Sequence, residues 1–425
     1  MTKEAHMDFR RRRRVNWWAI LFLLLLLGVA GWWLYPRVQI PQQMAVWLHQ
    51  PTPTPAFVID DGAAALAQAD ELVKQGKLDQ AIEQYQKTIQ VATKGAADSN
   101  RWADELAQQG KMDEATARRA EATQITKRSA VAYARLAKLL VLRRRAPEGI
   151  TAATQAIQLD DKNVEARAVL ALAYDWNDEY DKAITAALEA LTLDANYAEA
   201  HAYLAEAYAD RQRFDKALDE AYKAIQLNAN SPDAHYSLGW VLESRGNYSG
   251  AIAAYQRASE VAPNLSYLHI SLGRNYLAQN KTSQAIDAFL KAIEVDPGDA
   301  EAYDRLGRVY FGQQRYEDAL VQFQKATEVD PKYALAHGHM GWVYYSGLRN
   351  YEKAIASFQK ALELGSLKPR PAAEFHMETG WSYLFIGKCA EARTHFQKAL
   401  ELLAIAPDAA IAAQVQKGID ACRGK

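Results

Sequence analysis

The sequence predicts an all-α protein in which about ten helical hairpins stack into an α-solenoid, followed by a C-terminal cap helix and preceded by one transmembrane helix. Three observations support this expectation. Small residues recur at fixed places every 34 residues, each repeat holds two stretches with apolar residues at helical spacing, and a 19-residue segment near the N-terminus carries no charge. Such a recurrence is typical of helical-repeat arrays, whose units bury their apolar faces against one another.

The composition excludes several classes of protein. With 425 residues, 49% of them hydrophobic, the chain is neither disordered nor collagen-like and has room for a long array. Its 50 Lys and Arg residues balance 51 Asp and Glu residues, so no nucleic-acid partner is expected. Two cysteines, Cys389 and Cys422, are too few for a disulfide-built scaffold or a four-thiolate zinc site, and stability must come from packed apolar faces.

Residues 17–35 form the uncharged segment, which as a helix spans roughly 28 Å, close to the ~30 Å hydrocarbon core of a bilayer. Tryptophans lie near both of its ends, as at the two interfaces of a membrane. Five arginines, Arg10–Arg14, precede it, so the positive-inside rule places a basic N-terminus of residues 1–16 in the cytoplasm. We therefore expect a signal-anchor helix, a single-pass protein of the cytoplasmic membrane and an extracytoplasmic repeat array. The alternative is a cleaved signal peptide, because Gly28 and Ala30 are small residues at workable spacing.

A proline-rich linker is expected at residues 36–56, which contain five of the thirteen prolines. Proline favours extended conformations over helix, so this segment is interpreted as a semi-rigid spacer. The alternative is that the apolar residues 44–48 within it rest on the membrane surface.

The repeat array extends over residues 62–406. Its units begin at residues 62, 96, 130, 164, 198, 232, 266, 300, 334 and 373, the last shift coming from one extra residue in the turn of the ninth unit and four more after it. In every unit the eighth and twentieth positions are Ala or Gly, and the twenty-seventh is Ala in nine of ten. Two helices approach closely only where side chains are small, so each unit is expected to be a helical hairpin whose larger side chains pack around that contact.

The unit that starts at residue 300 carries an aromatic, Leu-Gly, Tyr, Ala, aromatic, Ala and Pro, as Tyr303, Leu306, Gly307, Tyr310, Ala319, Phe323, Ala326 and Pro331. This pattern resembles the tetratricopeptide repeat family, and the resemblance extends over residues 62–406. It is strongest from residue 232 to 396, where the twenty-fourth position is Tyr or Phe. Earlier units depart from it, with Arg119, Ala153, Ala187 and Ala221 at that position. The resemblance implies a right-handed solenoid, with residues 408–425 supplying the cap helix and the C-terminus.

The same resemblance implies a partner-binding surface, because the second, fifth, ninth and twelfth positions of each first helix face the concave side of such solenoids. From the sixth unit onward the candidates are Trp and Arg residues with flanking aromatic residues: Trp240, Arg274, Arg308, Trp342 and Trp381, with Tyr236, Phe311 and Tyr345. An acidic stretch precedes them, with Glu165, Asp175, Glu199, Glu206 and Asp210. Trp, Tyr and Arg are enriched at binding hot spots, so we hypothesise that this groove holds an extended or helical peptide whose acidic groups meet Arg274 and Arg308. The alternative is that some of these rings simply pack against neighbouring repeats.

No sequence signature of catalysis or cofactor binding occurs: a phosphate-binding glycine loop, an HExxH helix, a CxxC pair, an EF-hand loop and a GxSxG turn are all missing. We therefore expect no enzymatic activity, no cofactor and no metal site. Histidine occupies one repeat position in five units, as His201, His235, His269, His337 and His376. These rings are interpreted as packing between helices, with metal binding or pH sensing as the alternative.

Cys389 and Cys422 lie nearly one repeat apart, so the cap helix could bring Cys422 beside the turn that holds Cys389 and allow a terminal disulfide. Equivalent positions in adjacent repeats normally lie farther apart than the ~7 Å limit between the Cα atoms of a disulfide. The alternative is two unpaired thiols.

These observations favour a membrane-anchored scaffold or adaptor that binds partner proteins or peptides in its concave groove without catalysis. Its expected partners are other proteins or peptide segments, and the lipid bilayer through residues 17–35. Two alternatives remain open: an accessory subunit of a cell-envelope assembly or secretion machine, and a surface protein that binds glycans through its tryptophans.

Overall fold

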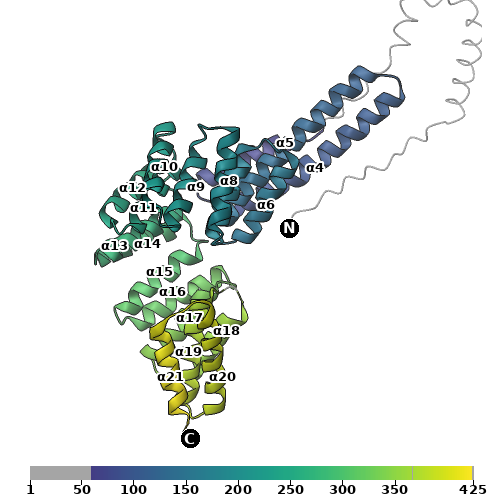
Figure 1. Ribbon diagram of the computed structural model, residues 1–425. Helices are drawn as coiled ribbons and strands as arrows, with labels where there is room; N and C mark the ends of the chain where they lie inside the picture. The colour runs from purple at the N-terminus through teal and green to yellow at the C-terminus, as the bar shows by residue number, and fades with distance from the viewer. Residues whose placement is uncertain (1–58, 366, 424–425) are drawn as a thin grey trace, which may run out of the picture. The chain divides into compact units, whose positions relative to one another are not determined.

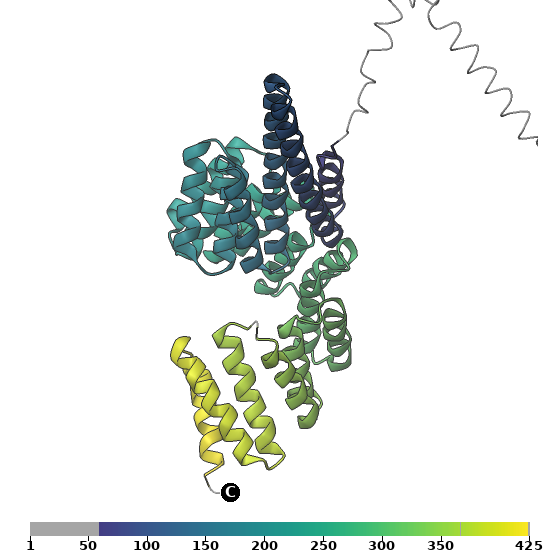
Figure 2. The same ribbon diagram turned by 90° about the vertical axis from the view of Figure 1, so that its right-hand side faces the viewer.

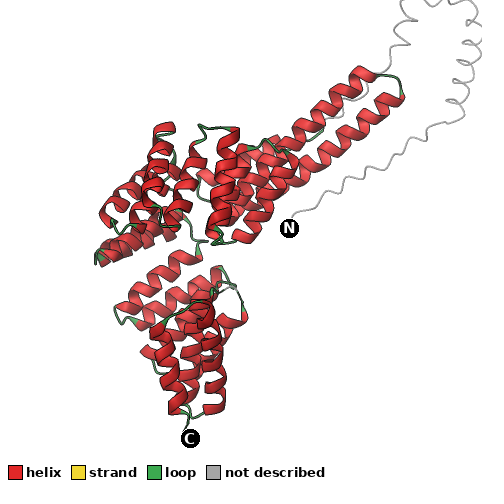
Figure 3. Cartoon of the chain, viewed as in Figure 1, coloured by secondary structure: helices red, strands yellow, loops and turns green. Residues whose placement is uncertain are grey.

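The computed structural model describes residues 59–365 and 367–423, and every regular element in this part of the chain is a helix (Figure 3). The first helices are α3 (Ala63–Lys74), α4 (Leu78–Gln108), α5 (Met112–Leu142), α6 (Ala146–Leu159), α7 (Val164–Trp176), α8 (Tyr180–Leu193), α9 (Ala198–Asp210), α10 (Phe214–Leu227), α11 (Pro232–Ser244) and α12 (Tyr248–Val261). They are followed by α13 (Ser266–Ala278), α14 (Thr282–Val295), α15 (Ala300–Gly312), α16 (Tyr316–Val329), α17 (Ala334–Trp342), the π-helical turn η1 (Val343–Gly347), α18 (Tyr351–Glu363), α19 (Pro369–Phe385), α20 (Cys389–Ile405) and α21 (Ala409–Ala421). This is the all-α, solenoid-like succession of helices that the sequence predicts.

From α7 onward the helices form successive hairpins, each packed on the next (Figure 1). The first helices α7, α9, α11, α13, α15 and α17 begin at residues 164, 198, 232, 266, 300 and 334, the unit starts read from the sequence. Side-chain caps fix several of these starts, because a helix N-terminus leaves backbone N–H groups without partners. Asn163 Oδ1 accepts the N–H of Ala166 at 2.9 Å, and Asp299 Oδ1 accepts that of Glu301 at 3.0 Å.

The first three units differ from the expected hairpins. The unit starts at residues 96 and 130 fall inside α4 and α5, which are continuous helices of 31 residues each and run side by side along their length (Figure 1). Later units are separated by short breaks such as Asp296–Asp299, which contains a proline. Neither residues 93–97 nor residues 127–131 contain a proline, and both end in alanine or valine, so nothing ends the helix there.

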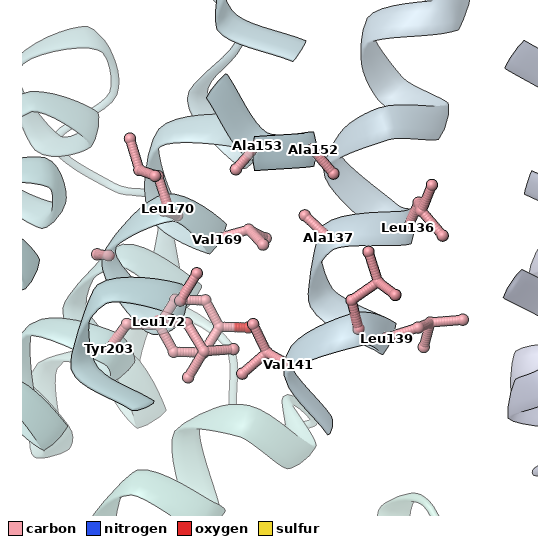
Figure 4. Close-up of a cluster of buried hydrophobic side chains, with 14 of the residues drawn as sticks. Leu136, Ala137, Leu139, Val141, Ala152, Ala153, Val169, Leu170, Leu172 and Tyr203 are labelled. Atoms are coloured by element: carbon pink, nitrogen blue, oxygen red, sulfur yellow. The ribbon is translucent and has the colours of Figure 1, made fainter. Parts of the chain in front are cut away.

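Small residues set the distance between the two helices of a hairpin. A Cβ atom on Gly273 would lie 2.4 Å from the ring of Phe289, and one on Gly307 would lie 2.7 Å from that of Phe323. Both rings are fully buried, so a glycine at the eighth position makes room for an aromatic residue at the twenty-fourth. In the third to fifth units both positions are alanine, as in the pair Ala137 and Ala153 of the buried cluster that joins α5, α6 and α7 (Figure 4).

The turn inside each hairpin also repeats. Its residue at the fifteenth position has a positive φ, whether or not it is glycine, in every unit but the ninth, where the extra residue moves it to Arg349; Gln314, for example, has φ +62°. The Gln314 N–H donates to the carbonyl of Phe311 and the Arg315 N–H to that of Tyr310, both at 2.9 Å, which satisfies the last carbonyls of α15.

The ninth unit accommodates its extra residue in the helix and not in the turn. The backbone passes from α17 into η1, where the N–H of Leu348 donates to the carbonyl of Val343, five residues earlier, at 2.9 Å. A π-helical turn of this kind holds one additional residue and changes the direction of the side chains around it. Tyr345 lies in this turn.

The last helix, α21, covers the final hairpin. It buries Ile411 and Val415 against α19 and α20, and the three helices lie side by side at the yellow end of the chain (Figure 2). An end unit of a solenoid needs such a cover, because its apolar face has no further repeat to pack on.

The predicted membrane localisation is corrected. Within residues 59–365 and 367–423, no helix combines the length and the apolar character that crossing a bilayer requires. The two longest helices, α4 and α5, carry charged side chains throughout. A single-pass protein of the cytoplasmic membrane with an extracytoplasmic array is therefore not supported. The segments on which that prediction rested, at residues 1–16, 17–35 and 36–56, lie outside the described residues.

Replacing Gly273 by Ala should lower the free energy of unfolding by about 1–3 kcal/mol, because the added methyl group meets the Phe289 ring and the core cannot absorb it without strain. Chemical denaturation followed by circular dichroism measures this loss. In the Phe289→Ala background the same substitution should cost less than about 0.5 kcal/mol, since the obstructing ring is gone. An equal cost in both backgrounds would show that the ring does not set the helix spacing.

Candidate partner-binding surface

The first helices α11 and α13 carry Tyr236, Trp240 and Arg274, three of the residues predicted to bind a partner. Tyr236 is buried and packs against the rings of Tyr255 and Tyr267, with centroids 5.4 and 5.2 Å away. The indole Nε1 of Trp240 donates a hydrogen bond to Asp210 at 3.0 Å. The three predicted residues of these units are thus in contact with other residues of the chain.

Arg274 already has an acidic partner in its own chain. Its guanidinium forms an ion pair with Glu243 at 3.0 Å, and it lies 5.4 Å above the ring of Trp240. Burial acts to lower the pKa of Arg274, but Glu243 outweighs it and the pKa is raised, so the side chain stays charged and paired. An acidic group of a partner would have to compete with Glu243 for this arginine.

Ion pairs also join units that are far apart in the sequence. They start mainly from the C-terminal end of α5 and the turn after it: Lys138 with Asp233 at 2.6 Å, Arg143 with Asp296 at 2.8 Å and with Asp79 at 3.0 Å, and Arg144 with Glu301. Another pair, Lys368 with Asp178 at 2.7 Å, joins the segment before α19 to the turn after α7. We call the pairs of Lys138, Arg143 and Arg144 the α5 ion-pair cluster. They connect the third unit to the sixth, seventh and eighth.

The acids of this cluster are shielded from solvent. The side chains of Asp233, Asp296 and Glu301 are 11%, 7% and 12% exposed. Burial acts to raise the pKa of Glu301, but Arg144 and Arg305 favour its ionised form and hold the pKa well below the usual range. A largely buried carboxylate that loses its cation is strongly destabilised, so these pairs resist separation.

The acidic stretch of the fourth and fifth units is partly buried, and this changes its charge. Glu206 is buried and accepts a hydrogen bond from the Ser237 hydroxyl at 2.5 Å. Burial raises its pKa to about 8 and, together with the neighbouring Asp210, raises that of Asp175 well above its usual value. The pKa of Asp210 is raised to about 6, again mainly by burial. Near neutral pH, therefore, protons neutralise part of this stretch.

The eighth to tenth units present a different surface. Arg308 is exposed on α15, and its side chain forms no ion pair or hydrogen bond within the described part of the chain. Phe311 is partly exposed, with the ring of Tyr316 5.8 Å away. Trp342 is also partly exposed and lies against His339 and Phe375, with ring centroids 4.9 and 5.7 Å away.

Four rings from η1, α18 and α19 lie together in the last two units, and we call them the C-terminal aromatic patch: Tyr345, Tyr351, Trp381 and Phe385. Phe385 is their common member. It stacks on Tyr351 at 4.8 Å between centroids and lies 6.1 Å from Tyr345 and 6.0 Å from Trp381. Its side chain is nevertheless 54% exposed. An exposed phenylalanine among three other rings is typical of a surface that a partner covers.

Two carboxylates, Glu374 and Glu378, share α19 with Trp381 and Phe385. Both are partly buried, and the pKa of Glu374 is raised by that burial. The pKa of Glu378 is raised to about 7, first by burial and then by the negative charge of Glu374, while a hydrogen bond with Tyr345 opposes the increase. No cation acts on Glu378 strongly enough to hold its pKa down.

Sequence reasoning missed Phe385, Tyr351, Glu374 and Glu378. Glu374 is at the second position of its unit and could have been found by the rule applied to the other units. Phe385 follows at the thirteenth position, one place beyond the last position considered. Tyr351 belongs to a second helix, and nothing in its spacing indicates that the π-helical turn brings Tyr345 beside it.

Four of the five repeated histidines make the same contact. The Nε2–H of His201, His235, His269 and His337 donates to the carbonyl oxygen six residues earlier, at 3.1, 2.9, 2.9 and 3.3 Å. Each ring therefore supports the turn that joins its unit to the preceding one. His376 instead lies with its Nδ1 3.0 Å from that of His395. Among the residues that the structure describes, no three His, Cys, Asp or Glu side chains come together as metal ligands.

Cys389 and Cys422 are close together but not bonded to each other. Burial raises the pKa of the Cys422 thiol, and a hydrogen bond with Cys389 raises it further. The cap helix therefore does bring the two side chains into contact, and their disulfide remains a prediction.

Comparison with known families agrees with this geometry. A family model described as tetratricopeptide repeat matches residues 169–233, 270–334, 305–373 and 343–410, and a second model of the same description matches residues 232–265. Together the matches cover more than half of the 425 residues. The chain belongs to the tetratricopeptide repeat family. No curated protein matches this tetratricopeptide repeat protein significantly by sequence.

Solved structures show the same fold. A chain in the crystal structure of the APC/C hetero-tetramer Cut9-Hcn1 shares 16% sequence identity with this chain, with a TM-score of 0.54. The match covers 84% of this chain and 76% of that chain. A human IFIT1 dimer with m7Gppp-AAAA is also 16% identical, with a TM-score of 0.52 and coverage of 82% and 95%. At this identity the likeness establishes the helical-repeat fold alone, which is typical of non-catalytic protein-interaction scaffolds.

Replacing Glu206 by Gln should stabilise the protein at pH 8 by at least about 1 kcal/mol and change little at pH 4.5. Because burial raises the pKa of Glu206 to about 8, the unfolded chain releases this proton first as the pH rises. Stability present at low pH is thus lost between pH 4.5 and about 8, and Gln, which mimics the protonated acid, avoids the loss. Urea unfolding at both pH values measures the difference. Glu317→Gln, at an exposed position, is the control, and a pH dependence equal in all three proteins would contradict this account.

Proposed function

We propose that the protein is a non-catalytic scaffold that binds segments of partner proteins on the first-helix face of its eighth to tenth units. One observation carries this proposal: Phe385, at the thirteenth position of the tenth unit, is 54% exposed at the centre of the C-terminal aromatic patch, whereas Tyr236, the aromatic candidate at the fifth position of the sixth unit, is 8% exposed. The binding surface is therefore shorter than the groove expected from the sequence and lies nearer to the C-terminus.

The side chains of this surface suit protein binding. Tyr and Trp rings bury a large area at a low cost in conformational entropy, and burying them contributes strongly to hot spots. The rings here are already held by one another, through the contacts of Phe385 with Tyr351, Tyr345 and Trp381. A surface fixed before binding loses little further freedom when a partner arrives, which favours affinity.

The fold supports the same function. Helical-repeat solenoids offer extended surfaces, and the tetratricopeptide repeats found here are typical of proteins that bind other proteins or peptides. Arg308, exposed and without an ion pair, extends the surface from α17 and α19 onto α15 and adds a position for a polar contact.

Photo-crosslinking in cells that produce the protein tests this proposal. A photoreactive phenylalanine analogue placed at position 385 should crosslink to a specific protein that mass spectrometry identifies. The same group at position 222 is the matched control, because Tyr222 is 51% exposed on the second helix of its hairpin, α10. Trp381→Ala should reduce the crosslink at position 385 by about tenfold while the helical circular dichroism stays unchanged. Equal crosslinking at both positions, or none at position 385, would contradict the proposed surface.

A further inference from the structure

We propose that the partner segment is cationic: one of its Lys or Arg side chains lies over the C-terminal aromatic patch, with its charge at Glu374 and Glu378. This assignment rests on the proposed function and specifies the chemistry of the partner. It differs from the expectation drawn from the sequence, in which arginines of this protein meet acidic groups of the partner.

The first argument is the placement of the two acids. Glu374, Glu378, Trp381 and Phe385 are spaced by four, three and four residues within the single helix α19. Residues at these spacings share one face of a helix. The two carboxylates therefore continue the row that Trp381 and Phe385 begin, and the Tyr345 hydrogen bond to Glu378 joins them to the patch.

The second argument is that two basic side chains nearby already have acidic partners. Arg370 forms an ion pair with Asp408 at 2.9 Å, and His339 lies 2.5 Å from Asp304. Among the described residues around the patch, Arg308 is left as a cation without an ion pair, and its field reaches Glu374. Arg370, although paired with Asp408, and Arg308 both favour the ionised form of Glu374, yet burial outweighs them and the pKa of Glu374 stays raised. A partner that brings positive charge therefore improves the balance.

The third argument is a related arrangement inside the array. In the sixth unit the ninth-position Trp240 is covered by Arg274, which comes from the ninth position of the next unit and pairs with Glu243. The tenth unit has a tryptophan at the same position, Trp381, and acids beside it. The helix that follows is the cap α21, whose ninth position in the repeat register holds the buried Val415. A partner's Arg or Lys would occupy the place that Arg274 occupies at Trp240.

Physical chemistry favours a long cationic side chain at such a place. Its alkyl stem packs on the rings while its charged end reaches a carboxylate, and a cation above an aromatic face gains about 0.5–2 kcal/mol. An acidic segment would instead add negative charge beside Glu374 and Glu378, where Arg308 is the nearby cation of the described residues that has no ion pair of its own. The structure therefore assigns this surface to a basic peptide segment.

Selection from a phage-displayed library of random 12-residue peptides tests the assignment on the full chain. Peptides selected on the wild-type protein should be enriched in Lys and Arg, and the Glu374→Gln/Glu378→Gln variant should lose that enrichment. The matched control is Glu317→Gln/Glu352→Gln, which removes two exposed acids without ion pairs elsewhere in the array and should select the same basic peptides. Circular dichroism confirms that each variant is folded.

Affinity measurements then quantify the contact. The most enriched peptide should bind the double variant about tenfold more weakly than the wild type, measured by fluorescence anisotropy. Binding to the wild type should also strengthen from pH 6 to pH 8, because a cation favours the ionised form of Glu378. The other charged or titratable groups around the two acids are Tyr345 on η1, His339 on α17, Arg308 on α15, Arg370 on α19 and Asp408 before α21. The double variant separates the contribution of the two acids from theirs.

The outcomes distinguish this inference from the proposed function. Enrichment of acidic or uncharged peptides that depends on Phe385 would overturn the cationic assignment and leave the binding surface in place. Basic peptides that bind the double variant as well as the wild type would also overturn it. No enrichment on the wild-type protein would contradict both. The charge reversal Glu378→Lys gives an independent check, since it should shift the selection toward acidic peptides.

Discussion

The proposed location of the binding surface depends on three cations at the C-terminal end of α5 and in the turn after it. Lys138, Arg143 and Arg144 pair with acids of the sixth, seventh and eighth units, and those acids are largely shielded from solvent. Because an unpaired carboxylate is costly in such surroundings, the pairs hold distant units together. The stacking of hairpins positions the first helices, and these ion pairs engage Asp233 and Glu301, which hold the second position on the face that the family resemblance assigns to binding.

The C-terminal units remain outside this network and have the complementary properties. Three rings from η1 and α18–α19 surround the exposed Phe385 there, and the two acids Glu374 and Glu378 keep raised pKa values. The π-helical turn in the ninth unit contributes directly, because it carries Tyr345, which contacts both Phe385 and Tyr351.

The sequence predicts the repeat well and the site only in part. A close contact such as that of Gly307 with Phe323 restricts both positions in the sixth to tenth units, so it leaves a regular pattern that can be read directly. The repeat pattern does not predict the continuous helices α4 and α5. A helix that continues across a unit boundary is recognised only because residues that end helices are absent there, and no residue type marks it directly. The pairing of Lys138 with Asp233 depends on small rotations between units that accumulate over the intervening repeats, and no local pattern encodes their sum. For the same reason, the shared ninth position of Trp240, Arg274 and Trp381 does not predict which of these side chains has a partner within the chain.

Hydroxyl-radical footprinting of the free protein tests most directly whether the binding face is limited to the C-terminal units. Oxidation measured by mass spectrometry should be strong at Phe385, which is 54% exposed, and weak at Tyr236, which is 8% exposed. Replacing Lys138 and Arg144 by Gln should raise the oxidation of Tyr236 and leave that of Phe385 unchanged, since only the former lies within reach of the α5 ion-pair cluster. Equal oxidation of Tyr236 and Phe385 in the wild-type protein would show that the whole groove is open and would contradict the account.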